Sequence, residues 1–226
     1  MPSTDFVVYS PLLNYTFNYP EFTTGVVKSE NTAQIQVDWT GGTMTYTDWE
    51  GDSQTFTTLQ FHFHAPSEHT VNGKQYDLEV HIVHLQASTN KLAVIGVFFD
   101  SSLDVSNCFL ESLKLNSIGT TNLEIPVNEF LSSIKPDFYS YSGSLTTPTC
   151  DEVVSWIVMK EVQYMSKEQL AYFTSRWADD ASFAGGKGTN RITMPLNGRQ
   201  VYTNSFAVKV LAQGLAVLGV IFVALL

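Results

Sequence analysis

All five histidines of the 226-residue chain lie between His62 and His84. The stretch at 61–64 reads Phe-His-Phe-His, so aromatic and imidazole side chains alternate. In an extended strand, residues i and i+2 project from the same face, which puts His62 and His64 side by side. Neutral imidazole is a preferred ligand of Zn²⁺. The spacing therefore predicts a strand that offers two ligands to a metal ion.

A third imidazole is expected from the strand that returns after a tight turn. Asn72-Gly73 favours a two-residue hairpin turn, because both residues tolerate positive φ. In the following run, 77–85, Glu79 and His81 are two residues apart, so they project from the same face of the strand. If that face meets the imidazole face of the first strand, three imidazoles converge and leave a fourth metal position open to water, as in catalytic zinc sites. The predicted zinc ligands are His62, His64 and His81.

Two further residues are placed to orient these ligands. Gln60 and Glu79 each precede a ligand by two residues and share its face, where they can accept the second imidazole N–H. Such acceptors fix the tautomer and the direction of a metal-bound histidine. His69 and His84 lie outside the pattern, and for both we expect hydrogen-bonded core residues.

These blocks resemble the α-class carbonic anhydrases. The resemblance rests on Gln-Phe-His-Phe-His at 60–64, Ser-Glu-His-Thr at 67–70 and Leu-Glu-Val-His-Ile-Val-His at 78–84. The short link at 64–68 is similar to that of bacterial, plant and protist members. Further matches lie at 92–98, 141–148, 154–158 and 195–199, so the resemblance extends from about residue 31 to 201.

The resemblance implies reversible hydration of CO₂ to bicarbonate and a proton by a zinc-bound hydroxide. Three neutral ligands leave the metal its full charge, which lowers the pKa of bound water to about 7. By motif, Thr146 accepts a hydrogen bond from the hydroxide and donates its own proton to an ionised Glu68. The positions implied to line the substrate pocket are Val83, Val94, Leu145, Thr147, Val154 and Trp156.

One departure from the family pattern concerns the release of the proton. In the fastest relatives a histidine ferries the proton away from the metal, and the matching stretch at 30–37 has Ala33 at that position. Alanine cannot relay a proton. We therefore expect catalysis that is limited by proton transfer.

The composition predicts one acidic globular domain, 1–202. The formal net charge of −10 argues against a nucleic-acid partner, which needs basic patches. The fold class is predicted to be mainly β, with short surface helices around a central twisted, mostly antiparallel sheet. The expected strands are 33–39, 43–46, 55–64, 75–86, 92–99, 143–145 and 153–161, and the expected helices are 105–115, 127–134 and 167–177. Ser166 and Gln169 match a capping box for the last helix, and the glycines at 185–188 are interpreted as a surface turn.

The C-terminal stretch 206–226 is largely apolar and, as a helix of about 30 Å, would be long enough for a bilayer core. Two interpretations remain open: a transmembrane anchor, or a cleaved signal for a lipid anchor. Either one predicts a membrane-associated protein.

The N-terminus has neither the basic start nor the apolar core of a secretory signal. Family members carry a segment before Pro11 that this sequence lacks, and secreted ones pair a cysteine at the position of Cys150 with a partner in that segment. We therefore expect a chain without its true beginning and a catalytic domain outside the cytoplasm; an intracellular protein with two free thiols is the alternative. For function, the alternative is a non-catalytic binding or assembly subunit of a membrane complex, although such relatives usually lose a zinc histidine.

Overall fold

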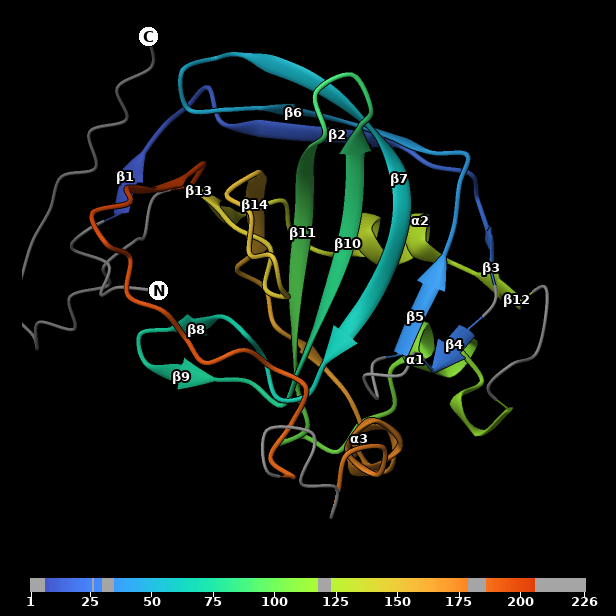
Figure 1. Cartoon of the computed structure of the whole chain (residues 1–226). Helices are drawn as coiled ribbons and strands as arrows, with labels where there is room; N and C mark the ends of the chain where they lie inside the picture. The colour runs from blue at the N-terminus through green and yellow to red at the C-terminus, as the bar shows by residue number, and fades with distance from the viewer. Residues whose placement is uncertain (1–6, 26, 30–34, 118–122, 179–185, 206–226) are drawn as a thin grey trace, which may run out of the picture.

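The computed structural model describes residues 7–25, 27–29, 35–117, 123–178 and 186–205. These residues build a curved twelve-stranded mixed sheet, two small two-stranded sheets and three short α-helices, and Figure 1 shows the long strands at the centre. Among the described residues, three strand pairs are parallel, β1 with β16, β11 with β14 and β11 with β15, and the other pairs are antiparallel. The predicted fold class, mainly β around a mostly antiparallel sheet, is confirmed.

The order of the strands places the histidine-rich segment in the middle of the sheet. Along its path lie β1 (Val7–Tyr9), β16 (Val201–Thr203), β13 (Phe138–Gly143), β14 (Val154–Met159), β11 (Lys91–Asp100), β10 (Leu78–Gln86), β7 (Ser53–His64), β5 (Ile35–Asp38) and β4 (Val27–Ser29). β6 (Thr43–Thr47) pairs with β7 and with β2 (Asn14–Asn18), and β15 (Gln163–Tyr164) pairs with β11. The two small sheets are β3 (Thr23–Gly25) with β12 (Leu123–Ile125), and β8 (Thr70–Val71) with β9 (Lys74–Gln75).

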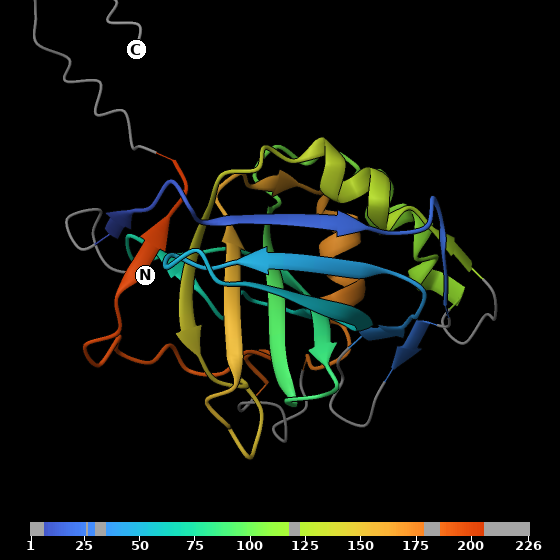
Figure 2. The ribbon, with the colours of Figure 1, turned by 90° about the horizontal axis from the view of Figure 1, so that it is seen from above.

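The helices cover the apolar face of the long strands. They are α1 (Cys108–Ser112), α2 (Val127–Ser133) and α3 (Lys167–Thr174), with a 3₁₀ turn at Leu115–Ser117; the view from above shows them beside the curved sheet (Figure 2). The ring of Phe61 packs against Phe109 of α1, and that of Phe63 against Phe173 of α3. Burial of these aromatic rings holds one face of β7 in the core, so its other face carries the histidines. Helix α3 begins with the predicted capping box.

The hairpin turn closes a smaller unit than the sequence suggested. Asn72 and Gly73 both have positive φ, 52° and 78°, but they join β8 to β9 in a two-stranded sheet of their own. Strand β7 ends at His64, and the next residues include Pro66, which has no N–H to continue a ladder. The chain therefore leaves the main sheet at the end of β7, before the turn. It returns as β10, which pairs antiparallel with β7.

Strand β16 sets the end of the described fold. The predicted boundary at residue 202 falls inside this strand, and Asn204 beyond it accepts a hydrogen bond from the Phe138 N–H (3.0 Å) and donates one to the Pro136 carbonyl (2.7 Å). Residues 206–226 and Ala33 lie outside the described residues. Within the described part, every helix is too short or too polar to pass through a bilayer.

Candidate metal centre

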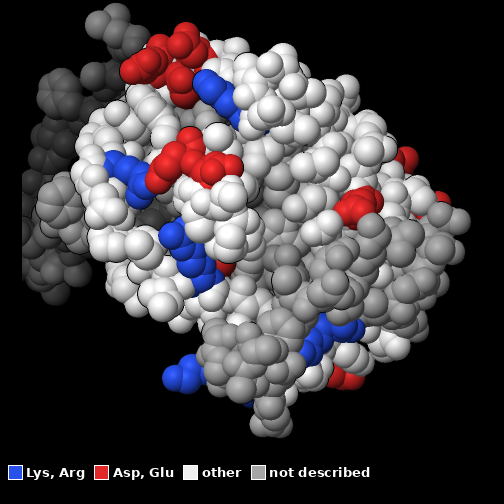
Figure 3. All heavy atoms as spheres, in the orientation of Figure 1, with Lys and Arg blue, Asp and Glu red and all other residues white. Residues whose placement is uncertain are grey.

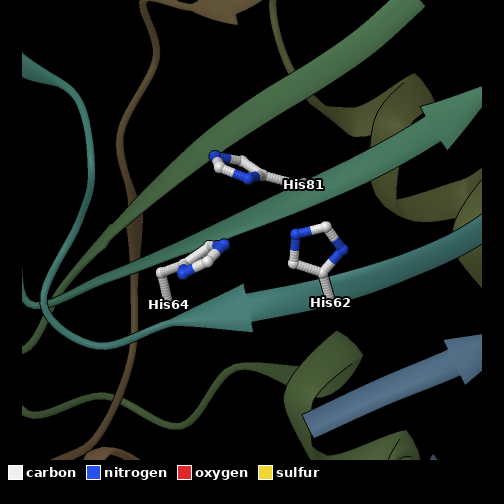
Figure 4. Close-up of side chains that lie close together, drawn as sticks. All are labelled: His62, His64 and His81. Atoms are coloured by element: carbon white, nitrogen blue, oxygen red, sulfur yellow. The ribbon is translucent and has the colours of Figure 1, made fainter. Parts of the chain in front are cut away.

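Three imidazoles meet on the open face of β7 and β10. His62 and His81 are direct partners in the antiparallel register, and His64 follows two residues after His62. Figure 4 shows the three rings turned toward one another above the two strands. One nitrogen from each ring lies within 4.8 Å of the other two. The exact two-residue period of the strands thus brings together the three histidines that the sequence singled out.

Hydrogen bonds decide which nitrogen each ring presents. Nδ1 of His62 lies 2.8 Å from Oε1 of Gln60, and Nε2 of His81 lies 3.0 Å from Oε1 of Glu79. An amide or carboxylate oxygen can only accept here, so each of these nitrogens carries the proton. His62 therefore offers Nε2 and His81 offers Nδ1 to the centre. Gln60 and Glu79 occupy the orienting positions that their spacing suggested.

The acceptor for His64 comes from a distant, irregular segment. Its Nδ1 donates to the carbonyl oxygen of Thr189, at 2.9 Å. The neighbouring Gly188, at φ +151°, lies so close to the chain that a Cβ would meet the Ala65 carbonyl at 2.6 Å. A residue with a side chain would push the segment away, so Gly188 lets Thr189 reach His64. Sequence reasoning missed Thr189; the glycines at 185–188 were the one signal in its vicinity.

Burial favours the neutral form of two of the rings, whereas the third ring is hydrogen-bonded to a carboxylate. Burial, assisted by mutual repulsion among the imidazoles, holds the pKa of His62 well below its ordinary value, and burial also lowers that of His64. Burial alone would lower the pKa of His81, but Glu79 outweighs it and raises that pKa. Burial opposes the ionisation of Glu79 in turn, yet His69 and His81 hold its pKa well below the usual range. Glu79 is therefore an anion inside the sheet.

Glu68 approaches the centre from the loop after β7. Its Oε1 accepts the backbone N–H of Arg191 at 2.7 Å. Its Oε2 is buried, has no hydrogen-bond partner in the described part of the chain, and lies 3.4 Å from Nε2 of His64. Thr146 borders the same space, but its hydroxyl makes no hydrogen bond to Glu68 in this structure. The donor to Glu68 that the family pattern implies therefore stays a prediction.

A cavity of about 260 Å³ opens beside His62 and His81. Most of the side chains that line it are apolar, and the lining includes every residue that the resemblance assigned to the substrate pocket: Val83, Val94, Leu145, Thr147, Val154 and Trp156. Leu59 and Gln60 both reach this cavity, since the register shifts between Val83 and His84, opposite the 58–60 stretch of β7. The strict alternation expected from Leu59 onward is thus broken by this irregularity.

A second set of potential ligands, His69, Glu79 and His81, also lies within 4.8 Å. Here the polar atoms already satisfy one another, because Nδ1 of His69 is 2.6 Å from Oε1 of Glu79, which also accepts from His81. This set is a hydrogen-bonded cluster, and the open ligand positions belong to the first.

Comparisons with known proteins identify the family of the chain. The family model described as eukaryotic-type carbonic anhydrase matches residues 3–205. The chain belongs to this family. It is similar to a carbonic anhydrase of Klebsiella pneumoniae (38% identity over 160 residues, 66% of this chain and 58% of that one). It is also similar to alpha carbonic anhydrase 4 of Arabidopsis thaliana (40% over 176 residues, 74% and 60%). The chain thus spans about three fifths of the length of these two relatives.

Solved structures of the same family show the same fold. The Photobacterium profundum alpha-carbonic anhydrase superposes with a TM-score of 0.70 at 34% identity, covering 87% of this chain and 84% of that one. An enzyme of Thermovibrio ammonificans, solved with the inhibitor sulfanilamide, gives a TM-score of 0.71 at 36% identity, covering 89% and 85%. The sequence resemblance to α-class carbonic anhydrases is confirmed.

Proposed function

We propose that this carbonic anhydrase family member is a zinc enzyme that reversibly hydrates CO₂ to bicarbonate and a proton. The observation that carries the proposal is the convergence of His62 Nε2, His64 Nε2 and His81 Nδ1, each ring oriented by a hydrogen bond from its other nitrogen. Three protein ligands and an open position are typical of catalytic zinc, whereas structural zinc has four protein ligands.

The residues present fit a zinc ion. The donor set is three imidazoles, two of them buried and that of His62 half-buried, and loss of hydration favours the neutral, metal-binding form of His62 and His64. Oε2 of Glu68 lies 3.4 Å from Nε2 of His64 and has no hydrogen-bond partner among the described residues. Burial of such an oxygen is unfavourable unless a cation or a hydrogen-bond donor lies nearby. When bound, zinc lowers the pKa of a water ligand to about 7 and so supplies a nucleophile at neutral pH.

The protein would bind and orient the reactants and would supply an apolar wall that excludes water. CO₂ is apolar, and the wall formed by Val83, Val94 and Trp156 offers it a surface that water binds poorly. In this proposal Glu68, held by the Arg191 N–H, would accept a hydrogen bond from the Thr146 hydroxyl, and the oxygen of that hydroxyl would then accept one from the reacting oxygen. Together, these residues would select one orientation of nucleophile and substrate.

Zinc analysis of the purified full chain, combined with a CO₂ hydration assay, tests the proposal. One zinc per chain and turnover that disappears with a chelator are the expected results. A chain that binds zinc stoichiometrically without hydrating CO₂ would favour the alternative, a binding or assembly subunit that keeps the family fold.

We further propose that residues 206–226 hold the protein on a membrane with the catalytic domain outside the cytoplasm. The proposal rests on the apolar composition of this stretch. Because Asn204 and Ser205 bond to the folded part, the informative truncation ends at Ser205. The shortened protein should leave the membrane fraction and keep its zinc and activity; continued sedimentation with membranes would contradict the anchor.

A further inference from the structure

A second cavity, of about 230 Å³, lies next to the zinc centre. Thr146 and Trp156 border both this cavity and the substrate pocket, whereas none of the three zinc ligands lines it. Figure 3 shows this face of the molecule hollowed where basic and acidic side chains meet. One water molecule needs roughly 10–15 Å³ of such space, so the cavity can hold a small organic molecule.

One part of the lining of this second cavity is apolar. Trp156 of β14 and Val201 of β16 are buried, and the segment 194–196, Met-Pro-Leu, adds side chains from outside the sheet. Met194 is 54% exposed, so part of its side chain is available to a ligand. An apolar body that leaves water for this lining is stabilised, and an aromatic ring can also pack against the Trp156 ring.

A cation also lines this cavity, and it has no carboxylate partner in the part of the chain that the structure describes. Nη1 of Arg191 lies 3.5 Å from the Ser144 hydroxyl oxygen and 3.4 Å from the Leu145 carbonyl oxygen, and both distances are long for hydrogen bonds. A guanidinium has five N–H donors arranged in a planar fork. Most of these donors therefore remain available to a ligand.

The other charged side chains of the cavity already have partners. Arg199 forms an ion pair with Glu152. Glu68 accepts the backbone N–H of Arg191 and lies against His64 at the zinc centre. The guanidinium of Arg191 is thus the charge of this lining that lacks a counterion among the described residues.

We propose that the second cavity is a binding site for a small carboxylate with a flat apolar body, the chemical class of an aromatic monocarboxylate. The carboxylate pairs with Arg191, whose fork of N–H donors matches two carboxylate oxygens. The apolar body lies against Trp156 and the segment 194–196. The site goes beyond the hydration of CO₂ and contains none of the zinc ligands, so it exists whether or not the chain binds zinc.

The two free cysteines report the occupancy of this cavity within one molecule. Cys150 lines the cavity and is partly buried, whereas Cys108 is exposed at the start of α1 and lies outside the lining. Benzoate is the probe, and benzamide, which has the same shape without the charge, is its control. The measurement is the alkylation of both thiols by neutral iodoacetamide in the zinc-loaded full chain, followed by peptide mass spectrometry.

At about ten times its Kd, benzoate should slow the alkylation of Cys150 about tenfold, because only chains with an empty cavity react. The alkylation of Cys108 should not change. Benzamide should protect Cys150 far less than benzoate does, since it cannot form an ion pair with Arg191.

Arg191→Gln removes the charge and keeps both a polar side chain and the backbone N–H that Glu68 accepts. This variant should need about 10- to 100-fold more benzoate for the same protection, the usual effect of losing a charge-assisted hydrogen bond. Lys91→Gln removes an equal charge from an exposed position on β11 and should behave as wild type. Met194→Ala shortens an exposed part of the lining and should weaken the protection about 2- to 5-fold without touching Arg191.

Equal alkylation of Cys150 with and without benzoate would overturn the inference. So would protection in Arg191→Gln that matches the wild type, or protection by benzamide that equals protection by benzoate. Protection that disappears when zinc is chelated would place the carboxylate on the metal and would also overturn the inference.

Discussion

The two faces of the β7–β10 pair contain similar groups and use them differently. On the open face, Tyr141 pairs with His69, and the acceptor on the far side of the ring is the Glu79 carboxylate. On the core face, the Tyr19 hydroxyl lies 2.5 Å from Nε2 of His84, and the acceptor for the other nitrogen is the Ala93 carbonyl at 3.1 Å. A Tyr–His pair that ends on a carbonyl is a neutral packing unit. The same pair becomes part of an ionic site when it ends on a carboxylate.

The burial of charge differs accordingly. Burial lowers the pKa of His84 to about 4, so this ring stays neutral among apolar neighbours. The open face keeps an anion, Glu79, whose pKa burial would raise but which His69 and His81 hold well below the usual range. A buried carboxylate is costly unless positive charge or several donors stabilise it. The open face is therefore prepared for a cation, and the core face is not.

The largest difference between the two faces should appear in metal binding. His81→Ala removes a ligand and should lose stoichiometric zinc and nearly all CO₂ hydration. His84→Gln alters the same strand on the other face and should keep both. Zinc content per chain after dialysis distinguishes them; zinc retained in full by His81→Ala would show that the ligand set is wrong.

A smaller loss is expected from residues beside the ligands. Thr146→Ala and Glu68→Gln should each lower the hydration rate by about 10² to 10³, the usual cost of losing one oriented hydrogen bond at a reacting oxygen, and both should keep zinc. Rates per bound zinc give the comparison. Wild-type turnover in both variants would remove these residues from the mechanism.

Much of this contrast was readable from the sequence, because a strand alternates with a fixed period. That period separated His62 and His64 from Phe61 and Phe63 and put Glu79 with His81. The capping box at Ser166 could also be predicted, because its two residues are only three positions apart in the sequence.

Contacts made across the fold could not be read in this way. Thr189 reaches His64 from 125 residues away, and Tyr141 meets His69 from 72 residues away. Neither residue lies in a pattern that specifies its partner. The shift in register after Val83 depends on how two strands pair, so the sequence of one strand does not contain it.

His84 on the core face should make the stability of the folded protein depend on pH. The pKa of His84 is about 4 in the folded protein against an ordinary value of 6.5. Above pH 6.5 its ring is therefore neutral in both the folded and the unfolded chain, and it does not lower the stability of the fold. As the pH falls from 6.5 to 4, only the unfolded chain takes up this proton, and stability falls by about 3 kcal/mol.

His84→Gln should lack that part of the loss. Denaturant unfolding of the metal-free protein at pH 7.5 and 4.5, for wild type and variant, measures the difference. An identical pH dependence in the two proteins would show that His84 does not resist protonation in the core.

The smallest effect concerns the exit of the proton from the open face. Ala33 offers no imidazole, so small buffers such as imidazole should raise turnover. Ala33→His should increase kcat several-fold and weaken the dependence on buffer, with kcat/KM little changed, because attack on CO₂ precedes this proton transfer. Stopped-flow hydration at several buffer concentrations tests it; fast, buffer-independent turnover of the wild type would point to another proton acceptor.

The proposed function depends on one zinc ion that binds to His62, His64 and His81 with one position left for water. An anomalous difference map at the zinc absorption edge, from crystals of the zinc-loaded chain, tests it most directly. We expect a single peak bonded to Nε2 of His62, Nε2 of His64 and Nδ1 of His81, with Glu68 unbound. A peak between His69, Glu79 and His81, or a fourth protein bond from Glu68, would contradict it.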